Sequence, residues 1–321
     1  MKKFFALVLA VAMALSVCSV ALADYPEKNV NGIIQWGEGG GTDVLMRPLA
    51  SLAEKDFGAS IVCQNMTGGT GSIAVQYVSD QEADGYNLLM GAENAPLYQV
   101  LGISELTYAD FDCVYLIGDE TVGIVVPKDS PYNSFTDIVN AALAEPESVT
   151  LSTTGKGGLP WEVGSFITSV TGATFNQIPY DSDKSALTAV MGGECEFTVC
   201  KVMSGRQYAE SGDIKFLCMF SKDEVAALPG VPSILAEYPA FEQYLPWGPF
   251  YGVFVKKGTD ASIIEKLSAA FSAAGQDPSY QEVLANRSIN FKGYTGAEAE
   301  QYITAYSANT IGALKTAGAI D

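Results

Sequence analysis

Short apolar runs alternate with longer amphipathic stretches along most of this 321-residue chain. The runs at 30–36, 59–64 and 87–91 have the length of buried strands, and the segments 42–57 and 71–80 between them have helical periodicity. A strand–helix–strand–helix–strand order predicts a parallel sheet with right-handed crossovers. The alternation therefore places the chain in the α/β class.

A second unit with the same alternation begins at the apolar run 122–127. The pattern predicts further strands at 148–153, 175–178, 195–200, 214–219 and 250–255, and further helices at 135–144, 161–171, 184–191, 261–274 and 297–313. The chain length also fits two domains of ordinary size. We expect two lobes, with residues 24–123 and 250–321 in lobe 1 and residues 124–249 in lobe 2.

The residue composition of the chain excludes several classes of function. It has no histidine, which excludes a catalytic triad with an imidazole base and any histidine-ligated zinc or haem site. Eighteen Lys and Arg against 37 Asp and Glu give a net charge of −19, the wrong sign for binding nucleic acid or an anionic membrane. We expect no nucleic-acid partner, no cofactor and no metal.

The first 23 residues have the pattern of an export signal. A short basic start precedes the apolar run 4–17, and Ala21 and Ala23 supply the small residues that a signal peptidase reads. The run is shorter than the roughly 20 residues that span a bilayer. We expect cleavage near Ala23 and a periplasmic location. Lipoprotein anchoring at Cys18 is the alternative, but a valine precedes that cysteine where a small residue is expected.

The cysteines that remain after such a cleavage do not form a recognisable set. Their number is odd, and they lack Cys-x-x-Cys spacing: Cys63, Cys113, Cys195, Cys200 and Cys218. Cys195 and Cys200 fall on one expected strand with opposite parity, so their side chains point to opposite faces. We expect no disulfide between these two, and buried small apolar side chains rather than metal ligands.

Two glycine-rich corners each follow a strand and start a helix, at residues 38–43 and 65–72. Glycine permits positive φ and lets backbone N–H groups approach a ligand. A helix start adds unpaired N–H groups and the positive end of the helix dipole. Because neighbouring parallel strands end at the same edge of a sheet, the two corners predict one anion-binding rim.

Two other interpretations of these corners stay open. Either corner alone is also compatible with a plain tight connection between strand and helix. The segment 69–74 fits the dinucleotide fingerprint G-x-G-x-x-A, but the acidic residue expected at the end of the next strand is missing, because that strand ends at Met90-Gly91. The pattern therefore favours a small anion over a dinucleotide.

Motifs from residue 25 onward follow one another in a characteristic order: Tyr25-Pro26, Trp36, Gly39-Gly-Gly-Thr-Asp43, Asn65…Gly68-Gly-Thr-Gly71, Asp84-Gly85-Tyr86, Thr154-Gly155-Lys156-Gly157-Gly158, Ile178-Pro179-Tyr180, Met191-Gly192-Gly193, Leu228-Pro-Gly-Val-Pro232 and Gly252-Val-Phe-Val255…Gly258-Thr259. In this order and spacing the chain resembles the tripartite tricarboxylate transporter substrate-binding proteins, the TctC/Bug family. The resemblance spans essentially the whole chain after the export signal.

The resemblance implies a two-lobed periplasmic-binding-protein type II fold with a ligand cleft between the lobes. It further implies a monomeric, non-catalytic receptor that captures a small organic acid and delivers it to a membrane permease. In that family the two glycine-rich loops hold a ligand carboxylate through backbone amides and ordered water, and they match residues 39–43 and 67–72 here. The second lobe closes with the segments that match 153–158 and 180–185.

From the corners and the resemblance together, we expect one set of ligand contacts: Trp36, Gly39, Gly40, Gly41, Thr42, Asp43, Thr67, Gly68, Gly69, Thr70, Gly71, Ser72, Glu93, Asn94, Thr153, Thr154, Gly155, Lys156, Gly157, Tyr180, Lys184 and Cys200. Asp43 could instead cap its helix. Lys156 and Lys184 could neutralise a second carboxylate. Glu93 would repel a citrate-like anion or accept an amino group, and it stands where the family generally has a small polar residue.

Two rival functions remain. A sensor that binds a carboxylate or an amino acid and feeds a signalling partner would have the same sequence features. A secreted Ser-dependent hydrolase lacks both an imidazole and the G-x-S-x-G elbow, so it would depend on Ser-Lys chemistry, for example through Lys156.

Overall fold

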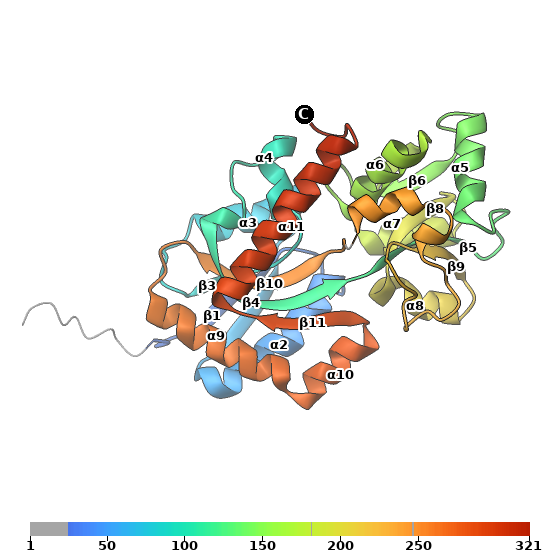
Figure 1. Ribbon diagram of the computed structural model, residues 1–321. Helices are drawn as coiled ribbons and strands as arrows, with labels where there is room; N and C mark the ends of the chain where they lie inside the picture. The colour runs from blue at the N-terminus through green and yellow to red at the C-terminus, as the bar shows by residue number, and fades with distance from the viewer. Residues whose placement is uncertain (1–24, 181, 246) are drawn as a thin grey trace, which may run out of the picture.

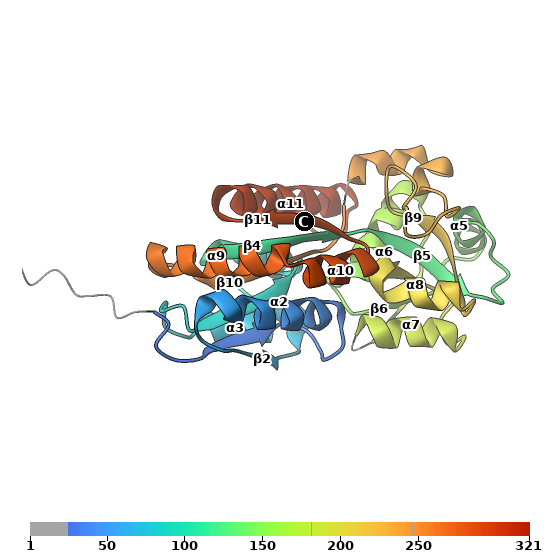
Figure 2. The same cartoon turned by 90° about the horizontal axis from the view of Figure 1, so that it is seen from below.

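The computed structural model describes residues 25–180, 182–245 and 247–321. These residues form two β-sheets that lie side by side, each with its own helices (Figures 1 and 2). The first sheet has the strand order β11-β4-β10-β3-β1-β2 and the bounds β1 (Val30–Ile34), β2 (Ile61–Asn65), β3 (Asn87–Ala92), β4 (Phe111–Glu120), β10 (Phe250–Lys256) and β11 (Ile289–Tyr294). The expected signal peptide, residues 1–23, and Cys18 lie outside the described residues.

The second sheet has the strand order β7-β6-β8-β5-β9. Its strands are β5 (Val122–Pro127), β6 (Thr150–Thr153), β7 (Asn176–Pro179), β8 (Phe197–Lys201) and β9 (Ile214–Met219). The helices among these strands are α5 (Phe135–Ala144), α6 (Leu159–Thr171), α7 (Asp183–Met191) and α8 (Val202–Glu210).

The helices that accompany the first sheet come from both ends of the chain. They are α2 (Gly41–Phe57), α3 (Ser72–Ser79), α4 (Tyr98–Leu101), α9 (Ala261–Gln276), α10 (Pro278–Asn286) and α11 (Gly296–Thr316). Short 3-10 helices are η1 (Gly69–Gly71), η2 (Ala95–Leu97), η3 (Tyr108–Asp110), η4 (Ile234–Ala236) and η5 (Pro239–Tyr244). Within the described residues, no helix is both long and apolar enough to cross a membrane.

The βαβαβ unit predicted at the start of the chain is confirmed. Strand β1 pairs in parallel with β2 and with β3, and its residues Val30, Ile33 and Ile34 are fully buried. The rest of the sheet departs from the parallel expectation, because β10 runs antiparallel to β3 and β4, and β11 is antiparallel to β4. The second sheet is also mixed, since β5 is antiparallel to both neighbours.

The chain passes between the sheets more than once, as predicted. A single residue, Thr121, separates β4 of the first sheet from β5 of the second, and the β4–β5 segment runs from one sheet to the other in both views (Figures 1 and 2). The return leads into β10. Beside this return, Trp247 Nε1 donates a hydrogen bond to Thr310 Oγ1 of α11 at 3.1 Å, which ties the return segment to the last helix.

Several predicted bounds coincide with the structure, and others do not. Strands β5 and β9 and helix α5 have the predicted limits. Helix α5 begins where Ser134 Oγ accepts from the Asp137 N–H and Asp137 Oδ2 accepts from the Ser134 N–H, a reciprocal capping box. Strand β1 ends two residues earlier than predicted, at Ile34.

Five of the α-helices and strands have no counterpart in the sequence prediction: β4, α4, α8, α10 and β11. Helix α8 has two buried residues, Val202 and Gly205, so its apolar stripe is weak. Strand β11 buries Ile289 alone and lies at the edge of the sheet. At nine and six residues, both elements are shorter than the window of about 11–18 residues in which a sequence period is judged.

All five cysteines in the described residues are free thiols. Cys195 lies before β8 and Cys200 lies within it, and both are buried. Burial raises the pKa of the Cys200 thiol well above its ordinary value. The described residues also contain no group of three or more Cys, Asp or Glu side chains placed to hold a metal ion.

Candidate functional site

A cavity of about 810 Å³ lies between residues of the two sheets. Fourteen of the predicted contacts line it: Trp36, Gly39, Gly40, Gly41, Thr42, Thr67, Gly68, Gly69, Thr70, Glu93, Asn94, Thr154, Tyr180 and Lys184. The structure thus brings both glycine-rich corners to one wall, with residues of the second sheet's loops and helices opposite them.

Eight predicted contacts do not line the cavity: Asp43, Gly71, Ser72, Thr153, Gly155, Lys156, Gly157 and Cys200. Lys156 is exposed at the surface, away from the cavity wall. Cys200 is buried behind it, where its Sγ lies 3.3 Å from the Lys201 carbonyl oxygen. Thr153 is also buried, and its Oγ1 accepts a hydrogen bond from the Gly155 N–H.

The first corner turns at Gly39, whose φ is +74°, and enters α2 through Gly40. The first N–H groups of an α-helix have no acceptor within the helix, and here Gly41 and Thr42 of that first turn line the cavity. A Cβ built on Gly41 would lie 2.7 Å from Met203 Cε, the flexible end of a side chain on α8, so a larger residue here would displace that side chain.

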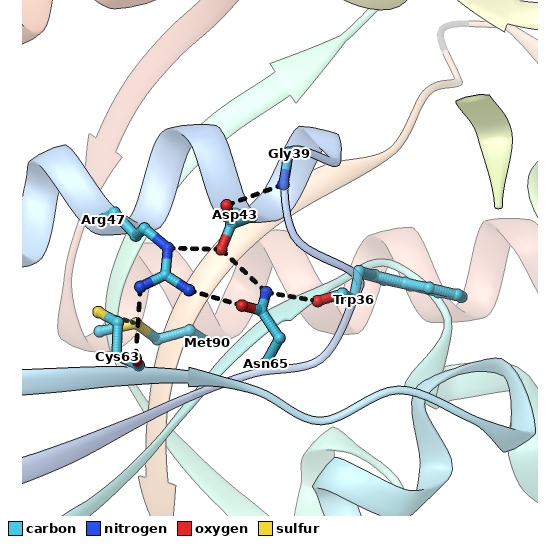
Figure 3. A network of polar contacts seen from close by, with 7 residues as sticks. All are labelled: Trp36, Gly39, Asp43, Arg47, Cys63, Asn65 and Met90. Atoms are coloured by element: carbon cyan, nitrogen blue, oxygen red, sulfur yellow. Dashed lines mark hydrogen bonds and ion pairs between the residues drawn. The ribbon is translucent and has the colours of Figure 1, made fainter.

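Asp43 belongs to a network behind the corner rather than to the cavity wall (Figure 3). Its Oδ2 accepts from the Gly39 N–H at 3.0 Å, and its Oδ1 lies 2.7 Å from Arg47 Nε. Asp43 Oδ1 also accepts from Asn65 Nδ2, at 2.8 Å. Asp43 therefore holds the Gly39 backbone and pairs with Arg47, but it does not cap α2, whose N-cap residue is Gly40 and has no side-chain cap.

Asn65 links the two corners. Its Nδ2 donates to the Trp36 carbonyl oxygen at 2.7 Å, and its Oδ1 accepts from Arg47 Nη2 at 2.5 Å. In Figure 3 the Trp36 side chain points away from this network. These contacts fix the backbone that leads into each glycine-rich segment, so both loops are held from behind by side chains.

The second corner has four consecutive residues with positive φ: Gly68, Gly69, Thr70 and Gly71. A Cβ on Gly71 would lie 2.0 Å from Gln35 Nε2, so the close contact with that buried side chain requires glycine. Gln35 Nε2 donates to Tyr98 Oη at 2.9 Å, and the Tyr98 hydroxyl donates to the Thr70 carbonyl oxygen at 2.8 Å. This chain of hydrogen bonds anchors the loop to the sheet.

Part of the cavity wall carries buried charged side chains, Glu93 and Lys201, and the sequence analysis predicted only Glu93 among the ligand contacts. Glu93 and Asn94 follow β3, and Lys201 ends β8; all three are buried and line the cavity. Lys201 Nζ lies 3.0 Å from Asp183 Oδ2 at the start of α7. Burial disfavours the charged ammonium, but Asp183 and the surrounding acidic groups outweigh it and raise the pKa of Lys201.

A second acidic group, Glu120, lies close to Lys201. Its Oε2 accepts from the Tyr251 hydroxyl at 2.9 Å and its Oε1 accepts from the Met203 N–H at 2.6 Å. Burial raises the pKa of Glu120 to about 7, against the opposing effect of Lys201. Burial also raises the pKa of Glu93, again opposed by Lys201.

Sequence reasoning missed the contribution of the β8–α8 segment to the cavity. The lining residues absent from the predicted set are Gly37, Glu38, Val44, Gly158, Leu159, Pro179, Ser182, Asp183, Leu187, Met191, Lys201, Met203, Ser204, Gln207, Tyr208 and Arg287. A signal was present for Lys201, a charged residue that directly follows the apolar run Phe197–Cys200 at the end of a strand. A hydrogen bond also joins loops that follow strands of the two different sheets: Asn94 Nδ2, after β3, donates to the Gly157 carbonyl oxygen, after β6, at 2.9 Å.

Two mixed sheets joined by crossing segments, with a cavity lined from both, are the two-lobed fold of the periplasmic binding proteins. The chain belongs to the tripartite tricarboxylate transporter receptor family, TctC, whose model matches residues 45–316. The family prediction from the sequence motifs is thereby confirmed, and receptors of this family are solute-binding proteins of the periplasm.

Individual relatives are similar over most of their length. Protein BugT of Bordetella pertussis is 28% identical over 283 residues, which cover 86% of this chain and 85% of BugT. The solved structure of the periplasmic binding protein BugD has a TM-score of 0.84 at 22% identity, covering 92% of this chain and 99% of that one. An R. palustris protein solved with adipate has a TM-score of 0.81 at 24% identity, covering 92% and 99%.

Proposed function

We propose that this protein is an exported receptor that captures a small organic acid and delivers it to the permease subunits of a tripartite tricarboxylate-type transporter in the membrane. The ligand is a di- or tricarboxylate or a related carboxylate. Membership of the receptor family supports the transport role, and the structural relative solved with adipate supports the ligand class. The receptor acts as a monomer and does not alter its ligand.

The observation that carries this proposal is the meeting of both glycine-rich corners at one cavity wall. Gly41 and Thr42 present the first turn of α2, and the loop 67–70 lies beside them. Backbone N–H groups at a helix start, together with the helix dipole, favour an anion without a cationic side chain. We therefore assign the ligand carboxylate to this wall.

Closure follows from the division of the chain. The β4–β5 crossing at Thr121, two residues before the predicted boundary at 123, and the return into β10 separate lobe 1 from lobe 2, and a ligand held by both lobes selects the state in which they meet. The contact between Asn94 and Gly157 belongs to that state. The surface formed on closure is then what the permease recognises.

Calorimetric titration and thermal unfolding test the ligand class. The panel contains mono-, di- and tricarboxylates, and each acid is paired with its neutral amide, for example adipate with adipamide. A carboxylate at 100 times its Kd is expected to stabilise the fold by about 2.7 kcal/mol, whereas its amide leaves the Tm unchanged. Binding confined to neutral sugars or nucleotides would contradict the proposal.

Uptake measurements test the delivery step. Deleting the gene in its own organism is expected to abolish uptake of the labelled carboxylate identified above, and expression of the gene from a plasmid is expected to restore it. Uptake that survives the deletion would instead favour the sensor function. Conversion of the bound acid to another compound during prolonged incubation would contradict the non-catalytic role.

A further inference from the structure

Glu93 is a buried carboxylate at the cavity wall, and one of its two oxygens has no hydrogen-bond partner among the described residues. It follows strand β3, is 3% exposed and lines the cavity wall. Within the described part of the chain, its Oε2 has no hydrogen-bond partner, and the same holds for Oδ1 of its neighbour Asn94. Buried acceptors without donors are costly, so two of them at one cavity wall point to a donor supplied from within the cavity.

Lys201, the nearby buried lysine, does not donate the missing hydrogen bond to Glu93 or Asn94. Lys201 Nζ pairs with Asp183 at 3.0 Å, and Glu120 stands in the same buried group, held by Tyr251. Three carboxylates, those of Glu93, Glu120 and Asp183, thus surround one buried ammonium. This part of the cavity wall carries more carboxylates than ammonium groups. A second ligand carboxylate placed against Glu93 and Asn94 would bring more hydrogen-bond acceptors to side-chain oxygens that are themselves acceptors.

Two parts of the cavity lining therefore differ in kind. The glycine-rich corners present N–H donors and the positive end of the α2 dipole, whereas Glu93 and Asn94 present acceptors beside Asp183 and Glu120, which share a single buried ammonium. A ligand that carries only carboxylates matches the first part alone. A ligand with a carboxylate and an ammonium matches both, because an ammonium has three donors and no acceptor.

We propose that the ligand is a small amino carboxylate whose ammonium group is bound by Glu93, with Asn94 Oδ1 as a second acceptor. This inference rests on the proposed function and narrows its ligand class. It applies to α-amino and to terminal amino acids alike, since both bring an ammonium and a carboxylate into one cavity. The experiment separates them.

The test titrates the full-length mature protein with matched pairs by calorimetry. Aspartate is compared with succinate and glutamate with glutarate, for the α-amino group. 4-Aminobutyrate is compared with glutarate and 5-aminopentanoate with adipate, for the terminal amino group. In at least one pair the amino compound is expected to bind at least about tenfold more tightly, the range of a charge-assisted hydrogen bond.

The variant Glu93→Gln is expected to lose that preference: affinity for the amino compound falls at least about tenfold, and affinity for its partner acid changes less than about threefold. Glu162→Gln is the matched control, because Glu162 is also a fully buried carboxylate without a hydrogen-bond partner in the described residues but does not line the cavity. Because Glu162 also interacts electrostatically with Glu93, its replacement is expected to change the two affinities by the same factor and to leave the preference for the amino compound intact.

The outcomes distinguish this inference from the proposed function. If the wild-type protein binds the acid without the amino group at least as tightly in every pair, the ammonium inference is refuted and the carboxylate receptor stands. If Glu93→Gln and Glu162→Gln lower the affinities equally, the inference is refuted as well. If no acid of either kind binds, both proposals are refuted.

Discussion

Replacing Tyr98 by Phe tests whether the second glycine-rich corner is anchored by the buried hydrogen-bond chain. The Tyr98 hydroxyl accepts from Gln35 Nε2 at 2.9 Å and donates to the Thr70 carbonyl oxygen at 2.8 Å. Burial raises the pKa of Tyr98, so the hydroxyl remains a donor at every working pH. The substitution removes one oxygen atom and leaves the ring in place.

The magnitude follows from the two groups left without a partner. Gln35 is fully buried, so its stranded N–H costs about 1–3 kcal/mol. Thr70 lines the cavity, where water can reach its carbonyl, and its loss costs about 0.5–1 kcal/mol. We expect the free energy of unfolding to fall by about 1.5–4 kcal/mol. Ligand affinity should fall too, because Thr70 has a φ of +54°, which a residue with a side chain rarely adopts without support.

Urea denaturation with an unchanged m-value measures the loss. The control is Tyr77→Phe on α3, since the half-buried Tyr77 makes no hydroxyl hydrogen bond among the described residues, and it should cost less than about 0.5 kcal/mol. A double-mutant cycle with Gln35→Met should show a coupling of at least about 1 kcal/mol. Equal losses in the two Phe variants, or additive effects in the cycle, would refute the anchoring role.

Two further predictions concern the second corner and the buried acids. Gly71→Ala should destabilise the fold by at least about 2 kcal/mol more than Gly102→Ala in denaturant titrations: both glycines have positive φ, but an added Cβ meets Gln35 at 2.0 Å in the first case and nothing within 4 Å in the second. Equal losses would show that the contact with Gln35 does not matter. Glu120→Gln should remove a pH dependence of the free energy of unfolding. The pKa of Glu120 is raised to about 7 from 4.5, so between these pH values the native state holds a proton that the unfolded state has released. The wild type therefore loses about 3 kcal/mol relative to the variant as the pH rises from 4.5 to above 7, and parallel stability curves over this range would contradict it.

The sequence determined the position of the two glycine-rich corners because their requirements are local. Each corner follows an apolar run and contains glycines, and the positive φ values of Gly39, Gly68 and Gly71 are the reason that glycine stands there. Parallel pairing of β1 with β2 and β3 then follows from the βαβαβ order. The family resemblance depended on these same local motifs, so it was available without coordinates.

The sequence alone did not determine the rest of the cavity wall. Helix α8 has too few buried positions to show helical periodicity, and the prediction stopped at Cys200, one residue before the lysine that lines the cavity. Similarly, Lys156 stands in a family motif but is exposed at the surface. Neighbouring residues in a strand or loop can point in opposite directions, and a motif match does not say which of them faces a ligand.

Only the tertiary structure decided which charges share the cavity. Glu93 comes from the end of β3, Asp183 from the start of α7 and Lys201 from the end of β8. Asp183 and Lys201 belong to the second sheet and its helices, and they meet Glu93, which lies about 90 residues or more earlier in the chain, because the two sheets pack side by side. Local patterns report what a backbone segment requires, whereas the balance of buried charge depends on which segments fold together.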